Sequence, residues 1–327
     1  MITILTPCYN TGNILYRLLD SILMQDYPSV EMFAINDGSS DNTESVIKSY
    51  IPKFENKGYK LNYIWQTNSG QSAAINNGLK YVNGEFLTWP DSDDYYSDKS
   101  ALSKFVNALA NANDDVAMVR CLPTSVSEKD CSLINVSNIN AELEKENQFE
   151  NCLYSRNFIW PPINYMIRTN AFFNSNPTKS IYVEKNAGQN WQMLLPVLYS
   201  YKCITLNEHL CHVLIRVDSH SRGQYKTYEQ LCARLSSYKN TIFNTLRNMP
   251  ALSESEISHY CSIIDNNYKL IEYDLAIQYK DTSSAKRIKE ELLKNGIKIS
   301  FKQELIFFLK RNKFTRKLLT VIRRLGI

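Results

Sequence analysis

The chain has 327 residues and a net charge of +4, and 44% of its residues are hydrophobic while 21% are charged. This balance is typical of a folded protein with two domains, or with one large domain and an appendage, and it excludes wholesale disorder. The modest charge gives no indication of a nucleic-acid partner. Eight cysteines without a C-x-x-C pair favour reduced thiols over a disulfide framework. No apolar run approaches the roughly 20 residues of a spanning helix, and the first residues lack a signal-peptide pattern, so we expect a cytoplasmic protein.

The first 120 residues alternate between strand-like and helix-like runs. The predicted strands are 2–5, 30–35, 61–65, 86–89 and 116–121, and the predicted helices are 14–24, 43–50, 71–80 and 100–110. This alternation is typical of βαβ units, so we expect an α/β fold with a mainly parallel sheet. Ligands of such sheets bind at the carboxyl ends of the strands. Polar clusters occur at these ends, at 8–11, 37–41, 66–70 and 91–94.

The pattern changes twice in the rest of the chain. Over 122–157 it weakens, and we expect a long loop with one short helix. It returns as a strand at 164–167, a helix at 189–199 and a strand at 204–215. Beyond residue 225 only helical periodicity remains, over 228–247, 253–278, 284–294 and 301–325. We therefore place a boundary near Gly223, with an α/β domain at 1–223 and an all-helical region at 224–327.

The segment GEFLTWPDSDDYY at 84–96 has three carboxylates directly after an apolar strand. Pro90 ends the strand, and in extended backbone Asp91 and Asp93 point the same way. Two carboxylates this close repel each other unless a cation lies between them or both stay in water. Mg²⁺ or Mn²⁺ takes such oxygen ligands and leaves positions for phosphate. The alternative interpretation is a solvated acidic loop.

Five motifs follow one another along the first 200 residues. They are T-P-C-Y-N at 6–10, N-D-G-S-S-D at 36–41, N-S-G-Q-S-A-A-I-N-N-G at 68–78, G-E-F-L-T-W-P-D-S-D-D at 84–94 and G-Q-N-W-Q-M-L-L-P at 188–196. In this order and spacing, roughly the first 220 residues resemble the family 2 glycosyltransferases, which have the GT-A fold. The resemblance implies a nucleotide-sugar-binding domain that transfers one sugar, from a UDP sugar, with inversion. It also implies Mn²⁺ or Mg²⁺ as cofactor.

The resemblance assigns nucleotide contacts to the strand-end loops, at Thr6, Pro7, Tyr9, Asn10, Asp37, Asn68, Gly70, Asp91 and Ser92. Tyr9 is expected to stack on the base, or else to pack in the core. Asp37 is expected to accept a ring N–H of uracil or guanine, or else to form the turn of its Asn-Asp-Gly sequence. Gly70 opens a helix whose free N–H groups can face an anion. Asp93, with Asp91, is the expected metal ligand.

The acceptor side departs from the family pattern, which has an acidic pair where this chain has Gln189 and Asn190. Neither amide can remove the proton of an acceptor hydroxyl. Glu184 and Asp218 are the candidate bases, with Glu184 ranked first, and each is alternatively a surface charge. The residues expected near the donor or acceptor sugar are Asp94, Gln189, Asn190 and Trp191, and His220 is expected on the phosphate side. Trp191 is alternatively a core residue.

Residues 301–327 carry eight basic residues against the single acid Glu304, with apolar residues at helical spacing. This suits an interfacial helix on the anionic inner face of the cell membrane, where a polyprenyl-linked saccharide would be the acceptor in bacterial surface polysaccharide synthesis. The alternative is a helix packed on the protein or on another subunit of an oligomer. Two other functions stay open: a scaffold subunit that binds a nucleotide sugar without turnover, and a sugar nucleotidyltransferase, although 6–13 lacks the basic Gly-rich loop of that class.

Overall fold

The computed structural model describes residues 1–185, 188–216 and 225–311. The chain forms two compact units. The first comprises Met1–Arg222 with Thr241–Leu252, and the second comprises Gly223–Asn240 with Ser253–Ile327. The division near Gly223 into an α/β domain and a helical region stays a proposal, because Thr241–Leu252 groups with the first unit.

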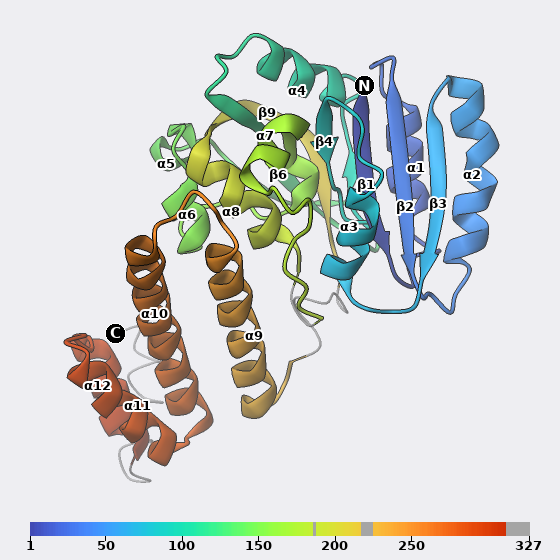
Figure 1. The fold of residues 1–327 in the computed structure, drawn as a ribbon. Coiled ribbons are helices and arrows are strands. Elements are labelled where there is room, and N and C mark those ends of the chain that lie inside the picture. Colours follow the sequence, from blue (N-terminus) through green and yellow to red (C-terminus); the bar gives the residue numbers. More distant parts are fainter. Residues whose placement is uncertain (186–187, 217–224, 312–327) are drawn as a thin grey trace. The chain divides into compact units, whose positions relative to one another are not determined.

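A mixed sheet forms the centre of the first unit (Figure 1). Its strands are β1 (Ile2–Cys8), β2 (Val30–Asp37), β3 (Lys60–Gln66), β4 (Phe86–Thr88), β5 (Tyr95–Tyr96), β6 (Val116–Ser127), β7 (Leu133–Val136), β8 (Tyr165–Arg168) and β9 (Lys202–Ile215). The order is β3-β2-β1-β4-β8-β6-β9-β5, with β7 paired to β6. Strands β3, β2, β1 and β4 are parallel, as are β6 and β9, whereas β8 runs antiparallel to both β4 and β6. The α/β class is confirmed, and parallel pairing is limited to these two groups.

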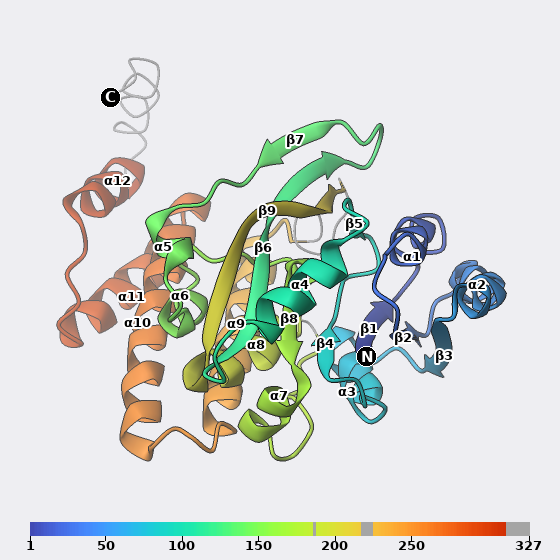
Figure 2. The same cartoon turned by 90° about the horizontal axis from the view of Figure 1, so that it is seen from above.

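Helices cover both faces of the parallel strands (Figure 2). The helices in the N-terminal part of the first unit are α1 (Tyr16–Leu23), α2 (Thr43–Lys57), α3 (Gln71–Leu79) and α4 (Ala101–Ala110). The apolar sides of α1, α2 and α4 join one buried cluster with the strand residues Ile4 and Met32. Helix α3 packs on the other face, where a Cβ on Gly78 would lie 3.0 Å from a methyl carbon of Leu5 and 3.1 Å from one of Ile35. The glycine therefore allows α3 to approach the sheet closely.

The prediction of a long loop over 122–157 is wrong. Strand β6 continues to Ser127 and returns as the hairpin strand β7. Its last residues pair with β9, from Pro123 opposite Cys211 to Ser127 opposite Ile215. This pairing supplies the backbone partners that the polar sequence does not reveal. The elements that follow are α5 (Ala141–Glu144), α6 (Phe149–Leu153), the 3₁₀ turn Pro162–Asn164, α7 (Thr169–Ser175) and α8 (Asn190–Ser200).

The C-terminal region is helical over its described residues, as predicted. Its helices are α9 (Tyr228–Arg247), α10 (Glu254–Tyr279), α11 (Thr282–Lys294) and α12 (Phe301–Arg311). A capping box of Ser253 and Glu256 begins α10. A small core joins Tyr273 of α10, Ile288 of α11 and Phe307 of α12. The part of the predicted terminal helix beyond Arg311 lies outside the described residues. Across the described ranges, no helix combines the length and the apolar character needed to cross a membrane.

Candidate active site

The loops after β1 and β2 are fastened to each other at the carboxyl edge of the parallel strands. Asn10 adopts a positive φ of 51°. Its backbone N–H donates to Ser39 Oγ at 3.0 Å, and its Oδ1 accepts the N–H of Ser40 at 2.8 Å. The N–H of Gly12 donates to Asp41 Oδ2 at 2.9 Å. These hydrogen bonds join the two loops into one surface at this edge of the sheet.

The side chain of Asp37 holds the loop after β3. Its Oδ1 accepts hydrogen bonds from Gln66 Nε2 at 2.8 Å and from the N–H of Ser69 at 2.9 Å. Its Oδ2 accepts one from the N–H of Gly70 at 2.9 Å. Asn68 Nδ2 donates to the Asp37 backbone carbonyl at 3.1 Å. Asp37 is 4% exposed, so it organises this loop and does more than form the local turn.

The residues of the first loop differ in what they offer a ligand. Tyr9 is 51% exposed, so its alternative as a core residue is wrong. Thr6 and Pro7 lie inside β1 with their side chains buried. The nucleotide contacts expected at these two buried residues stay predictions.

Asp91 and Asp93 follow β4, as the sequence predicts, and both lie in a polar network. Asp91 Oδ1 accepts hydrogen bonds from Gln71 Nε2 at 2.6 Å and from Gln189 Nε2 at 3.4 Å. Burial, together with the charge of Asp93, raises the pKa of Asp91 to about 7. Burial also raises the pKa of Asp93, and the Arg216 guanidinium opposes this shift from 3.5 Å. Burial therefore disfavours the ionised form of both carboxyl groups relative to exposed ones.

The neighbouring residues Ser92 and Asp94 turn inward. Ser92 is 7% exposed and Asp94 is 3% exposed. Asp94 Oδ1 accepts the N–H of Leu214 at 3.0 Å. This carboxyl therefore fastens β9 to the acidic segment, and the sugar contact expected of Asp94 stays a prediction.

Glu184 is fixed to the start of α3 through its backbone. Its N–H donates to Ser72 Oγ at 3.1 Å, and its carbonyl accepts from the same hydroxyl at 3.3 Å. Gly70 has a φ of +92°, and a Cβ there would lie 2.9 Å from the carbonyl oxygen of Lys185. Because Ser72 directly follows Gln71, the Glu184 backbone is anchored one residue from the amide that holds Asp91.

The first residues of α8 are held by their amide and indole groups. Gln189 is 1% exposed and contacts Asp91. Asn190 Nδ2 donates to the Trp160 carbonyl at 3.1 Å. Trp191 Nε1 donates to the Cys152 carbonyl at 3.3 Å, and its ring lies 5.1 Å from that of Trp160 in an edge-to-face arrangement. Within the described residues, Oε1 of Gln189 and Oδ1 of Asn190 are buried without a hydrogen-bond partner.

Two predicted residues, Asp218 and His220, lie outside the described residues. The structure adds Gln71 and Arg216, which the sequence reasoning missed although they contact the two key carboxyls. The sequence feature that could have identified Arg216 is its position as a basic residue directly after the long predicted strand at 204–215. Among the residues that the structure describes, no group of three or more His, Cys, Asp and Glu side chains is placed to hold a metal.

The family model of "Glycosyl transferase family 2" matches residues 3–181, which is more than half of the chain. The chain belongs to glycosyl transferase family 2. An uncharacterised glycosyltransferase of Rickettsia typhi is 33% identical over 134 residues, which are 41% of this chain and 39% of that protein. Glycosyltransferase GlyA of Streptococcus pneumoniae is 40% identical over 94 residues, 29% of this chain and 13% of GlyA. The chain therefore matches about two fifths of the Rickettsia relative.

Solved structures confirm the GT-A type fold of this family 2 member. S. aureus TarS (residues 1–349), in complex with UDP-GlcNAc, aligns with a TM-score of 0.59 at 17% identity, covering 99% of this chain and 92% of that one. The mannosyltransferase PcManGT of Pyrobaculum calidifontis, in complex with GDP-Man and Mn²⁺, aligns with a TM-score of 0.55 at 15% identity, covering 98% and 83%. At these identities the likeness concerns the fold alone.

Proposed function

We propose that this family 2 protein transfers one sugar from a UDP sugar to a saccharide acceptor with inversion at the anomeric carbon. The observation that carries the proposal is the pair Asp91 and Asp93 beside the loops that Asp37 organises. The edge offers an exposed aromatic ring, backbone N–H groups and two carboxyls, which suit a base, a diphosphate and a cation respectively. Complexes of TarS with UDP-GlcNAc and of PcManGT with GDP-Man support a nucleotide-sugar donor.

The hydrogen bonds of Asp37 favour uracil as the base. A carboxylate has about four acceptor positions, and three N–H groups of Gln66, Ser69 and Gly70 occupy three of them. Counting the described residues, one position is left on Oδ2. Uracil offers one ring N–H, whereas guanine presents a ring N–H and an amino group side by side. The exposed ring of Tyr9 would stack on the base.

The donor atoms of Asp91 and Asp93 fit Mg²⁺ or Mn²⁺. Both are oxygen donors, and the raised pKa of each carboxyl falls when a cation is close. Asp93 would hold the ion with Asp91, and the diphosphate would supply further oxygens. Such an ion would neutralise the diphosphate charge and so improve it as a leaving group. Arg216, beside Asp93, brings a second positive charge to the same place.

Glu184 is the proposed base that takes the proton of the acceptor hydroxyl. Gln189 and Asn190 cannot do this, because an amide has no basic oxygen at neutral pH. The two hydrogen bonds between Ser72 and the Glu184 backbone hold that backbone next to Gln71, and Gln71 binds Asp91. Asp218 is the second candidate. On the acceptor side the paired rings of Trp160 and Trp191 offer an apolar edge to a sugar.

The proposal also includes a lipid-linked acceptor at the inner face of the membrane, and helix α12 is the element that supports it. Phe301 is 80%, Leu305 42% and Phe308 65% exposed, and their spacing puts them on one side of the helix. Residues 301–327 carry eight basic residues and one acid. An exposed apolar stripe on a basic segment suits an anionic bilayer surface. This supports a polyprenyl-linked saccharide of a surface polysaccharide as acceptor.

A non-catalytic subunit that binds a nucleotide sugar is the second candidate, because amides replace the usual acids at Gln189 and Asn190. A nucleotidyltransferase is set aside by the family assignment. Calorimetry with UDP, GDP and ADP, each with and without Mn²⁺, tests the donor site. We expect UDP to bind more tightly than GDP and ADP. We also expect the affinity for UDP to be high only when Mn²⁺ is present. Equal affinity for the three nucleotides would contradict the base assignment, and no binding of any of them would contradict both candidate functions.

A further inference from the structure

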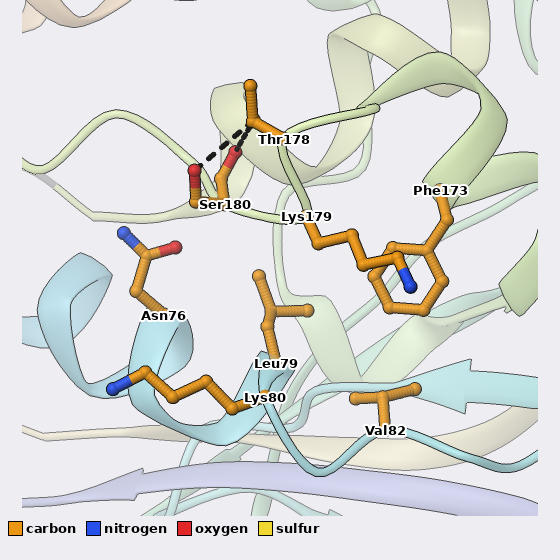
Figure 3. A pocket seen from close by; sticks show the side chains of 8 residues that line it. All are labelled: Asn76, Leu79, Lys80, Val82, Phe173, Thr178, Lys179 and Ser180. Atoms are coloured by element: carbon orange, nitrogen blue, oxygen red, sulfur yellow. Dashed lines mark hydrogen bonds between the residues drawn. The ribbon is translucent and has the colours of Figure 1, made fainter.

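A surface pocket of about 590 Å³ lies at the far end of α3 (Figure 3). Leu79, Val82 and Phe173 form its apolar lining. Lys80 ends α3, ten residues after Gly70, and at 1.5 Å per residue this is about 15 Å along the helix axis. The pocket is therefore separate from the strand-end loops, and none of the residues that line it belongs to the donor site.

The polar residues that line the pocket, within the described ranges of the chain, carry positive charge and include no carboxylate. Lys80 and Lys179 line it together with the hydroxyls of Thr178 and Ser180. Lys179 Nζ lies 5.3 Å from the centre of the Phe173 ring, and Lys80 Nζ donates to the neutral Asn77 Oδ1 at 3.3 Å. In the view of Figure 3, Leu79 lies between these two lysines. Neither ammonium group has an acidic partner among the residues that the structure describes, which favours a negatively charged ligand.

The pocket is connected to the segment that carries the proposed base. Asn76, on its wall, forms two hydrogen bonds of 2.7 Å with Ile181, one to its carbonyl and one from its N–H. Ser180 directly precedes Ile181, and Glu184 follows three residues later. Both ends of the 180–184 segment are thus fastened to α3, at Asn76 and at Ser72. A ligand that reaches from the pocket along this segment arrives at Glu184.

We propose that this pocket binds an anionic sugar unit of the acceptor, one bearing a carboxylate or a phosphate, at a distance from the unit that receives the new sugar. The inference rests on the proposed function and names the class of its acceptor. The apolar lining would contact the C–H face of the sugar ring. Its hydroxyls would pair with Thr178 and Ser180, and its charge with Lys80 or Lys179, whose ammonium groups point to opposite sides in Figure 3. The pocket would thereby hold the acceptor in register for Glu184.

Binding of model saccharides to the full chain tests this inference without requiring turnover. The probes are tetragalacturonate, glucose 6-phosphate and neutral galactotetraose, measured by calorimetry at low salt. The test variant is Lys80→Gln with Lys179→Gln. The matched control is Lys53→Gln with Lys57→Gln, which removes the same charge from exposed positions of α2. We expect an anionic probe to bind at least about tenfold more tightly than the neutral one, and the test variant to lose at least about tenfold, because it removes both positive charges that line the pocket.

Galactotetraose binding as tightly as the anionic probes would overturn the inference, and so would equal losses in the test and control variants. If glucose 6-phosphate binds more tightly than tetragalacturonate, the charge is a phosphate, and the reverse identifies a carboxylate. UDP titrated into the same samples separates this inference from the proposed function. The lysine variant keeps its UDP affinity, because Lys80 and Lys179 lie outside the donor site. Failure of the wild-type chain to bind UDP would contradict the proposed function, whereas UDP binding without anionic saccharide binding contradicts only the pocket assignment.

Discussion

Replacing Asp37 with Asn tests whether this single side chain organises the donor-site loops. The amide keeps the shape of the carboxylate but retains only one acceptor oxygen. If that oxygen takes the place of Oδ1, it keeps the bonds from Gln66 and Ser69 and leaves the N–H of Gly70 facing an NH₂ group. The opposite orientation loses two bonds. With a hydrogen bond to a charged group contributing about 1.5–3 kcal/mol, we expect the first unit to lose about 2–4 kcal/mol of unfolding free energy.

The four tryptophans at positions 65, 89, 160 and 191 all belong to the first unit. Urea unfolding followed by tryptophan fluorescence therefore reports on this unit alone. The control is Asp114→Asn, which makes the same change at an exposed residue. The midpoint of Asp37→Asn is expected to fall clearly below that of the control, and its UDP affinity is expected to fall as well, because Gly70 is released. Equal midpoints and equal UDP affinities for the two variants would refute the reasoning.

Three further predictions concern the acidic pair and α12. Because the pKa of Asp91 is raised from 3.8 to about 7, the folded unit binds protons more tightly than the unfolded chain, so its stability without metal falls as pH rises from about 4 to 7. Asp91→Asn should reduce this fall, and identical urea midpoints against pH would contradict the assignment. Asp93→Ala should abolish the effect of Mn²⁺ on UDP affinity while the fold stays intact, and a Mn²⁺ effect of wild-type size in calorimetry would remove the metal assignment. Replacing Phe301, Leu305 and Phe308 with Ser should weaken binding to anionic vesicles by at least about 100-fold in co-sedimentation, since burying each such side chain contributes about 1.5–3 kcal/mol and about 1.4 kcal/mol is tenfold, and unaltered binding would make α12 a packing element.

The sequence predicted which loops meet at the carboxyl edge of the parallel strands because local patterns control them. Strand–helix alternation alone placed Asp37, Gly70 and Asp91 at one edge of a sheet, and the structure brings their loops together there. Predicted helix boundaries were less accurate where one residue disfavours the helix that its neighbours form. Pro52, for instance, lies inside α2, which continues to Lys57, although proline disfavours a helix interior.

The features that the sequence did not reveal depend on partners far along the chain. Asp94 binds the N–H of Leu214, 120 residues later, so nothing local indicated that it turns inward. The contact of Arg216 with Asp93 depends on the same arrival of β9 beside the acidic segment. The strand character of residues 123–127 likewise comes from pairing with β9. In each case, tertiary pairing decides a role that residue type and spacing leave open.

Turnover of nucleotide sugars measures the central claim most directly. The chain is incubated with Mn²⁺ and a panel of UDP, GDP and ADP sugars, and the released nucleoside diphosphate is recorded with and without a saccharide acceptor. We expect slow hydrolysis of at least one UDP sugar, faster release with acceptor, and a loss of acceptor-dependent release by roughly two to four orders of magnitude in Glu184→Gln at unchanged donor affinity. A wild-type rate in Glu184→Gln with a loss in Asp218→Asn would move the base to Asp218. If UDP binds but no nucleotide sugar is cleaved under any condition, the chain is a binding subunit and the proposed transfer is contradicted.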